Sequence, residues 1–177
     1  RRGKSMTVEG DVSLNIIIRE ACESDLSILI EYNRALAKET ENLSLNTNVL
    51  RLGIQNALKL ENCHYFVAEL DGNVVGQTMI TSEWSDWRNA EMWWLQSVYV
   101  HPDYRKRGVF HSIFKYIEII SKKNHSVKSL RLYVMQNNVV GLKTYRNMGM
   151  DDSGYLVYEK TLLPSIKPTP KKKSMSD

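Results

Sequence analysis

Residues 95–114, LQSVYVHPDYRKRGVFHSIF, are the stretch of the sequence that decides the fold. The stretch begins with an apolar run at 98–100 that is rich in β-branched and aromatic residues and is typical of a buried strand. A turn at 101–103 ends the run, and a basic loop at 105–108 leads into a helical pattern. A strand, a glycine-containing loop and a helix start in this order favour anion binding, because the first N–H groups of a helix lack intrahelical partners and its dipole is positive there. A solvated basic turn is the alternative interpretation of the loop.

The sequence on either side of this stretch predicts a mixed sheet with helices on its faces. Asp71-Gly72 is a tight-turn sequence that joins two strands into an antiparallel hairpin. The polar residues 82–90 are expected to form a loop. The order β-α-α-β-β-β-α-β-α-β predicts the α/β (α+β) class. Hydrophobic periodicity places strands at 15–19, 64–69, 74–81, 92–100, 129–134 and 155–162, and helices at 25–38, 48–60, 109–122 and 139–148.

The chain is long enough to form one domain with a core of its own. It has 177 residues, of which 42% are hydrophobic, so no disulfide or metal is needed to stabilise it. We expect a single domain over residues 15–163. Residues 1–14 are expected to be a disordered segment or a remnant of cloning, and 164–177 a disordered basic tail rich in proline, lysine and serine.

Composition and charge exclude several classes of protein. Much of the net charge of +4 lies in the two end segments, and the basic tail contains no aromatic residue, so nucleic acid is not expected as a partner. Cys22 and Cys63 lie far apart without a CxxC pair, which predicts neither a metal site nor a disulfide framework and favours a reducing, cytoplasmic location. No apolar run approaches the length of a membrane span. We therefore expect a protein that binds neither a metal nor a membrane.

Two motifs in the sequence resemble those of the GNAT superfamily of acyl-CoA-dependent N-acetyltransferases. The first is the strand VYV followed by Arg105-x-x-Gly108-x-Phe110, where the family has Gly or Ala in place of Phe110. The second is Asn138-x-x-Gly141-x-x-x-Tyr145-x-x-x-Gly149-Met150, where the family usually has Ala for Gly141 and Gly-Phe for the last pair. The order of elements also matches the family, and the resemblance extends over about residues 16–162.

The resemblance implies an acyl-CoA N-acyltransferase that uses acetyl-CoA as its acyl donor. The reaction implied is direct attack of a primary amine in a ternary complex, because no cysteine occupies a motif position. A compact chain without an accessory domain favours a small amine as the acceptor. A protein N-terminus or lysine is the second choice, and a CoA-binding regulatory module without turnover is the alternative from another class.

The resemblance also implies that the central strand and loop hold acetyl-CoA. The backbone of Val98 and Val100 pairs with the pantetheine arm as a strand partner would, and the N–H groups of residues 106–111 receive the pyrophosphate. Asn138 contacts the pantetheine amides, caps the short helix, or does both. The predicted cofactor-binding residues are Val98, Tyr99, Val100, Arg105, Lys106, Arg107, Gly108, Val109, Phe110, His111 and Asn138.

Tyr145 matches the general acid of the family, which protonates the leaving thiolate; the alternative is a tyrosine that serves only the core. The general base is open, because the long strand has Trp94 and Gln96 where some family members have glutamate. Glu83 and Glu91 are the nearest carboxylates in the sequence, and either could act directly or through water. Each is alternatively a surface carboxylate without a catalytic role.

All four tryptophans lie within residues 84–94. Trp93 and Trp94 are consecutive on a strand and therefore face opposite sides of the sheet. We expect one to join the core and the other, assigned here to Trp94, to line the acceptor site. Trp84 and Trp87 form either a cation–π pocket for an ammonium group or a homodimer contact. The predicted substrate-binding residues are therefore Trp84, Trp87 and Trp94.

Overall fold

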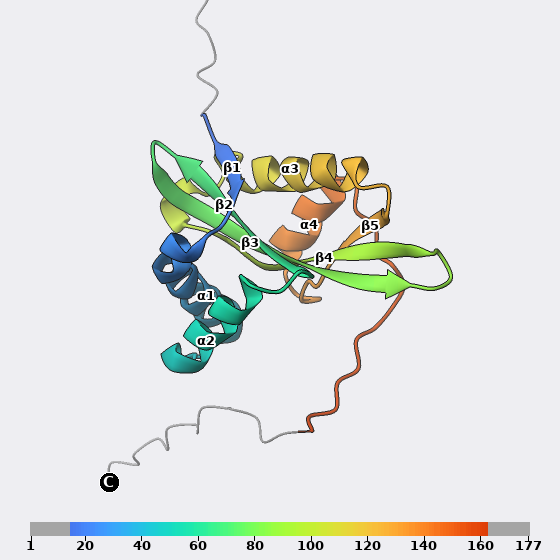
Figure 1. Ribbon diagram of the computed structural model, residues 1–177, viewed down its shortest axis with the longest axis horizontal. Helices are drawn as coiled ribbons and strands as arrows, with labels where there is room; N and C mark the ends of the chain where they lie inside the picture. The colour runs from blue at the N-terminus through green and yellow to red at the C-terminus, as the bar shows by residue number, and fades with distance from the viewer. Residues whose placement is uncertain (1–14, 163–177) are drawn as a thin grey trace, which may run out of the picture.

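The computed structural model describes residues 15–162, which form one five-stranded sheet with helices on both faces (Figure 1). The predictions for residues 1–14 and for the chain from residue 163 onward lie outside the described residues. The sheet has the order β1-β2-β3-β4-β5, with antiparallel pairing up to β4 and a parallel β4–β5 pair. The predicted mixed, mostly antiparallel sheet is confirmed. The strands are β1 (Ile17–Glu20), β2 (Cys63–Leu70), β3 (Asn73–Ser85), β4 (Ala90–Val100) and β5 (Val127–Leu132).

The helices divide between the two faces of the sheet (Figure 1). α1 (Leu26–Glu41) and α2 (Thr47–Ala57) cover one face, where they pack on β2 and β3. α3 (Val109–Lys123) covers the other face, and α4 (Val139–Asn147) follows β5. The buried residues of α3 are spaced one or two helical turns apart, so they form a single face of the helix that packs on the sheet. They are Val109, Ile113, Phe114, Ile117 and Ser121.

Two sequence predictions differ from the structure. Residues 82–85 belong to β3 and pair with the start of β4, so the loop contains only residues 86–89. These polar residues form a strand because pairing satisfies their backbone groups even where the side chains remain in solvent. Residues 155–162 were expected to be a strand, but they have no strand neighbour in the described chain and are exposed throughout. A strand requires a partner for its N–H and C=O groups, so the described sheet ends at β5.

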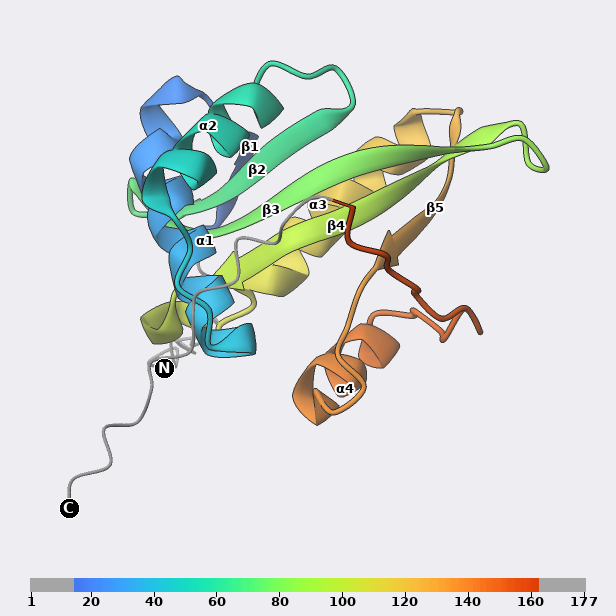
Figure 2. The ribbon, with the colours of Figure 1, turned by 90° about the horizontal axis from the view of Figure 1, so that it is seen from below.

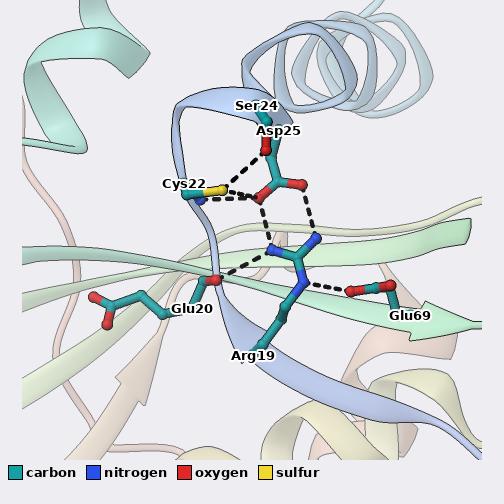
Figure 3. A network of polar contacts seen from close by, with 6 residues as sticks. All are labelled: Arg19, Glu20, Cys22, Ser24, Asp25 and Glu69. Carbon is teal, nitrogen blue, oxygen red and sulfur yellow. Dashed lines mark hydrogen bonds and ion pairs between the residues drawn. The ribbon is translucent and has the colours of Figure 1, made fainter. Parts of the chain in front are cut away.

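A partly buried ion pair connects β1 to the start of α1 (Figure 3). Both terminal nitrogens of Arg19 donate to the carboxylate of Asp25, at 2.7 and 2.9 Å, and Nε of Arg19 donates to Glu69 on β2. The same carboxylate accepts from the N–H of Cys22 at 2.9 Å. The side chain of Asp25 is only 6% exposed, and the hydrogen bonds from Arg19 hold the pKa of Asp25 below its usual value. This network fixes α1 against the edge of the sheet.

Candidate active site

β4 separates from β5 halfway along its length. The parallel pairing runs from Glu91 opposite Val127 to Leu95 opposite Leu132, where β5 ends, whereas β4 continues to Val100. Figure 2 shows β5 diverging from β4 toward α4. Residues 96–100 therefore have no strand partner on that side within the described chain. This segment includes Val98 and Val100, whose backbone the family resemblance implies as the partner of the pantetheine arm, and that contact stays a prediction.

A β-bulge lies in the middle of this free edge. The register between β3 and β4 shifts here. Gln77 lies opposite Tyr99 and Met79 lies opposite Gln96, so a step of two residues on β3 corresponds to a step of three on β4. Ser97 adopts a left-handed conformation with φ +50°, which is unusual for a residue other than glycine. Its carbonyl accepts from Nε2 of Gln77 at 3.2 Å. Bulges bend a strand and turn its backbone groups away from the regular ladder, so the bulge helps to direct β4 away from β5.

The start of α3 lies directly beyond the end of β4. Its N-cap residue, Gly108, has φ +82° and offers no side-chain cap to the first N–H groups of the helix. Lys106 is also left-handed, with φ +59°. Apart from its chain neighbours, no atom lies within 4 Å of the position that a Cβ at Gly108 would occupy. Uncapped amides, a positive helix end and open space together suit a phosphate group.

A close contact between α3 and the sheet holds this helix start in place. Val109 is buried in the core on the α3 face. A Cβ added at Gly76 on β3 would lie 3.1 Å from Cγ1 of Val109 and 3.2 Å from the carbonyl oxygen of Tyr99. Glycine at position 76 therefore lets the first turn of α3 approach β3, where β3 pairs with the end of β4.

Arg105 does not point toward the helix start. Its guanidinium donates from Nη2 to Glu39 at 2.7 Å and from Nε to the carbonyl of Val100 at 2.9 Å. It also lies 5.4 Å from the ring centre of Tyr99, whose hydroxyl donates to Glu39 at 3.2 Å. The side chains of Arg105 and Tyr99 thus connect the loop to the end of α1, and contact with acetyl-CoA through their backbone stays a prediction. Sequence reasoning missed Glu39, since nothing local distinguishes it from other acidic residues of an exposed helix.

The remaining predicted residues of the loop differ in how far they are buried. Lys106, Arg107 and His111 are exposed. The guanidinium of Arg107 lies 5.4 Å from the ring centre of Tyr104. Val98 and Val100 turn their side chains into the core on the α3 face, which leaves only their backbone to face the gap between β4 and β5.

Tyr145 is brought close to the loop by an aromatic contact. Its ring meets that of Phe110 edge-on, with centroids 5.8 Å apart, and Phe110 in turn packs on Phe114 at 6.2 Å. The departure from the family pattern at position 110 therefore has a structural role, because the phenyl ring joins α3 to α4. Burial raises the pKa of Tyr145 above its ordinary value. A phenol with a raised pKa remains a proton donor over a wider pH range.

Asn138 caps α4, as one of the two sequence interpretations expected. Its Oδ1 accepts from the N–H of Gly141 at 2.9 Å. A Cβ at Gly141 would come within 2.7 Å of Nδ2 of the same side chain, so glycine replaces the usual alanine where the cap folds over the helix. α4 ends at Asn147, and Gly149 follows with φ +81°, as expected for a glycine that terminates a helix.

The two candidate bases lie on opposite faces of the sheet, and each is held by a tryptophan. The indole N–H of Trp93 donates to Glu91 at 2.9 Å, on the face covered by α3. The indole N–H of Trp94 donates to Glu83 at 2.6 Å, on the other face. Trp93 packs against the core on the α3 face, so the two tryptophans face opposite sides of the sheet as their consecutive positions predict, and a role of Trp94 in the acceptor site stays a prediction. Trp94 precedes Gln96, where the free edge of β4 begins, by two residues, whereas Glu83 lies opposite Met92, farther from that edge.

Trp84 and Trp87 lie at the far end of the β3–β4 hairpin, which projects beyond the rest of the sheet (Figure 2). They are 61% and 88% exposed. The structure does not bring them to the loop or to Tyr145, and both interpretations of these residues, a cation–π pocket for the substrate and a homodimer contact, stay predictions. Among residues 15–162, no group of three or more His, Cys, Asp or Glu side chains is arranged to hold a metal ion. Every helix in the described part of the chain is too short or too polar to traverse a lipid bilayer.

Comparisons with known proteins agree with this architecture. The sequence model of the acetyltransferase (GNAT) family matches residues 29–150. The chain is 28% identical to thialysine N-epsilon-acetyltransferase of Bos taurus over 149 residues, which cover 77% of this chain and 85% of the bovine protein. A possible acetyltransferase from Clostridium difficile 630 has 40% identity and a TM-score of 0.79, covering 84% of this chain and 98% of the clostridial one.

A more distant structure shares the fold. A predicted acetyltransferase from Clostridium acetobutylicum, crystallised with acetyl-CoA, has 16% identity and a TM-score of 0.68, with 82% of this chain and 96% of that chain covered. Three observations indicate the same family. The family model matches most of the chain, the Clostridium difficile protein is similar in sequence and structure, and the five-stranded sheet has a β4 that diverges from β5. The chain belongs to the acetyltransferase (GNAT) family and is an acyltransferase.

Proposed function

We propose that the protein transfers an acetyl group from acetyl-CoA to the primary amine of a small molecule, by direct attack of the amine in a ternary complex. The observation that carries the proposal is the free edge of β4 at residues 96–100, which leads directly to the uncapped start of α3. An extended pantetheine arm with its amides matches the edge. A pyrophosphate matches the amides of the helix start.

The relatives support both substrates. The bovine relative is named for the acetylation of thialysine, which is a small molecule with a primary amine. The protein from Clostridium acetobutylicum was crystallised with acetyl-CoA. A small amine is also consistent with the open surface beside Trp94, where α1 and α2 do not cover the sheet.

The proposed chemistry uses Tyr145, whose ring contacts Phe110 in the first turn of α3, and a carboxylate on the sheet. The amine nitrogen attacks the thioester carbonyl, the carbon–sulfur bond breaks, and the leaving thiolate takes the proton of the Tyr145 phenol. The raised pKa of Tyr145 keeps that proton available at neutral pH. We assign the proton lost by the amine to Glu83, through water, because Glu83 lies on the face away from α3 whereas Glu91 is held on the α3 face by Trp93.

A thiol-release assay with acetyl-CoA and a panel of amines tests the proposal. We expect release of free CoA with at least one small primary amine. Tyr145→Phe should lower kcat by about 10²–10⁴-fold while CoA binding, measured by calorimetry, is retained. The phenyl ring preserves the contact with Phe110, so a loss of rate in this variant reports the hydroxyl. CoA binding without thiol release from any amine would instead indicate a binding module and contradict the proposal.

A further inference from the structure

A group of polar and aromatic side chains lies on the open face of the sheet, where β4 and β5 begin to separate. We call it the vertex cluster: Glu83 on β3, Trp94 on β4, Arg131 on β5 and Tyr133 just after β5. Trp94 lies opposite Arg131 in the parallel register, one pair before the pairing ends. The cluster therefore borders the free edge of β4 on the face away from α3.

The side chains of the vertex cluster contact one another directly. The rings of Trp94 and Tyr133 stack with centroids 4.5 Å apart and 23° between their planes. The guanidinium of Arg131 lies 5.5 Å from the ring centre of Trp94, and its Nη1 is 3.4 Å from Oε1 of Glu83. Glu83 also accepts from the indole of Trp94. The cluster thus combines a flat aromatic surface with a guanidinium of fixed orientation.

The guanidinium retains capacity for a second anion. Within residues 15–162, its only hydrogen bond is the long one from Nη1 to Glu83, so Nε and Nη2 remain available as a fork. The side chain of Arg131 is 25% exposed, and Tyr133 is 58% exposed. A guanidinium fork fits a carboxylate in a bidentate geometry, and a partly buried cation beside an aromatic surface binds it more strongly than one in open solvent.

We infer that the vertex cluster is the acceptor site and that Arg131 selects amines that carry a carboxylate, that is, amino acids acetylated on a side-chain amine. The inference rests on the proposed function. Trp94 and Tyr133 provide the surface for the aliphatic part of the acceptor, and Glu83 orients the guanidinium. Gln96, the first residue of the free edge, lies about 7 Å along β4 from Trp94. The side chain of lysine is long enough to span that distance and place its amine at the thioester.

The inference is tested with L-lysine and L-lysinamide, which carry a carboxylate and a neutral amide, respectively, at the same position. For the unmodified protein, kcat/KM for lysine should exceed that for lysinamide by about 10- to 100-fold, the range expected for hydrogen bonds to a charged group. In Arg131→Gln the ratio should fall toward unity with KM for acetyl-CoA unchanged. Arg88→Gln removes an exposed arginine in the β3–β4 turn and should leave the ratio unchanged.

Calorimetric titration of lysine into the CoA-loaded protein separates this inference from the proposed function. Binding that is lost in Arg131→Gln, without thiol release by any amine, would support the acceptor site and contradict the transferase reaction. Turnover of lysine and lysinamide with equal kcat/KM, or a preference that persists in Arg131→Gln, would support the reaction and overturn the acceptor site. Thermal unfolding of Arg131→Gln shows whether the variant is folded. If it is not, the lysine-to-lysinamide ratio of the unmodified protein alone decides.

Discussion

Replacing Gly108 by alanine should have two effects that can be measured separately, one on the stability of the fold and one on the affinity for CoA. Gly108 has φ +82°, and a left-handed conformation costs an L-residue about 1–2 kcal/mol. Since no atom beyond its chain neighbours lies within 4 Å of the added Cβ, the strain is the whole stability cost. For a chain of this length, about 1 kcal/mol lowers Tm by about 2–4 °C. We therefore expect Tm to fall by about 2–8 °C.

The effect on cofactor binding should be larger than this strain explains. An alanine at position 108 relieves part of the strain by rotating the backbone, and that rotation turns the first amides of α3 away from the phosphate position. Hydrogen bonds to charged groups contribute about 1.5–3 kcal/mol, so the loss of one raises Kd for CoA by about 10- to 100-fold. Calorimetric titration of CoA measures this change, and a thermal scan measures the strain.

Gly72 provides a matched control for this experiment. It has φ +77° and likewise no atom within 4 Å of an added Cβ, but it lies in the turn between β2 and β3. Gly72→Ala should therefore lose similar stability and keep the Kd for CoA of the unmodified protein. Equal Kd values for the two variants would refute the placement of the pyrophosphate on the start of α3.

The other predictions concern the proposed general acid Tyr145, the proposed general base Glu83 and the ion pair of Arg19 with Asp25. Phe110→Ala removes the ring that supports Tyr145 and should lower kcat by about 10- to 100-fold, with CoA affinity retained because the backbone binds it. The pKa of Tyr145 is raised by burial, so kcat should decline only above about pH 10, and the decline should be absent in Tyr145→Phe. Glu83→Gln should lower kcat about tenfold or more, whereas Glu91→Gln, on the opposite face, should leave kcat unchanged. Asp25→Asn should lower the free energy of unfolding by about 1–3 kcal/mol at neutral pH. Folding lowers the pKa of Asp25. The stabilisation by the Asp25 carboxylate is therefore complete above about pH 4 and is lost as the pH falls further.

Each of these outcomes has a direct measurement. Steady-state kinetics over a pH series gives kcat for the Tyr145, Glu83 and Glu91 variants. Chemical denaturation at neutral and acidic pH gives the free energy of unfolding of Asp25→Asn. A kcat for Phe110→Ala equal to that of the unmodified protein would show that the ring does not position Tyr145. Equal kcat losses in Glu83→Gln and Glu91→Gln would contradict the assignment of the base by sheet face. A stability difference in Asp25→Asn that persists unchanged at pH 3 would show that the carboxylate charge is not its source.

Local sequence patterns were sufficient for most of the elements. Helices and strands follow side-chain periods that depend only on near neighbours, and Asp71 and Gly72 both adopt the positive φ of the predicted turn. Predictions from local patterns were wrong where strand formation depends on pairing with a distant part of the chain. Residues 82–85 are mostly polar but pair with β4, whereas residues 155–162 begin with an apolar run typical of a strand but have no partner in the described chain.

The sequence by itself determined the family, the place of the loop before α3 and the opposite orientations of Trp93 and Trp94, because motif spacing and strand alternation are properties of consecutive residues. Only the tertiary structure decided which side chains meet across the sheet. The alternation of residues 129–134 indicates that Arg131 and Tyr133 share a face, but the β4–β5 register alone places them beside Trp94. Likewise, the pairing of Arg105 with Glu39 depends on how α1 packs on the sheet. Register and helix packing are set by contacts between residues far apart in the chain, and no local pattern encodes them.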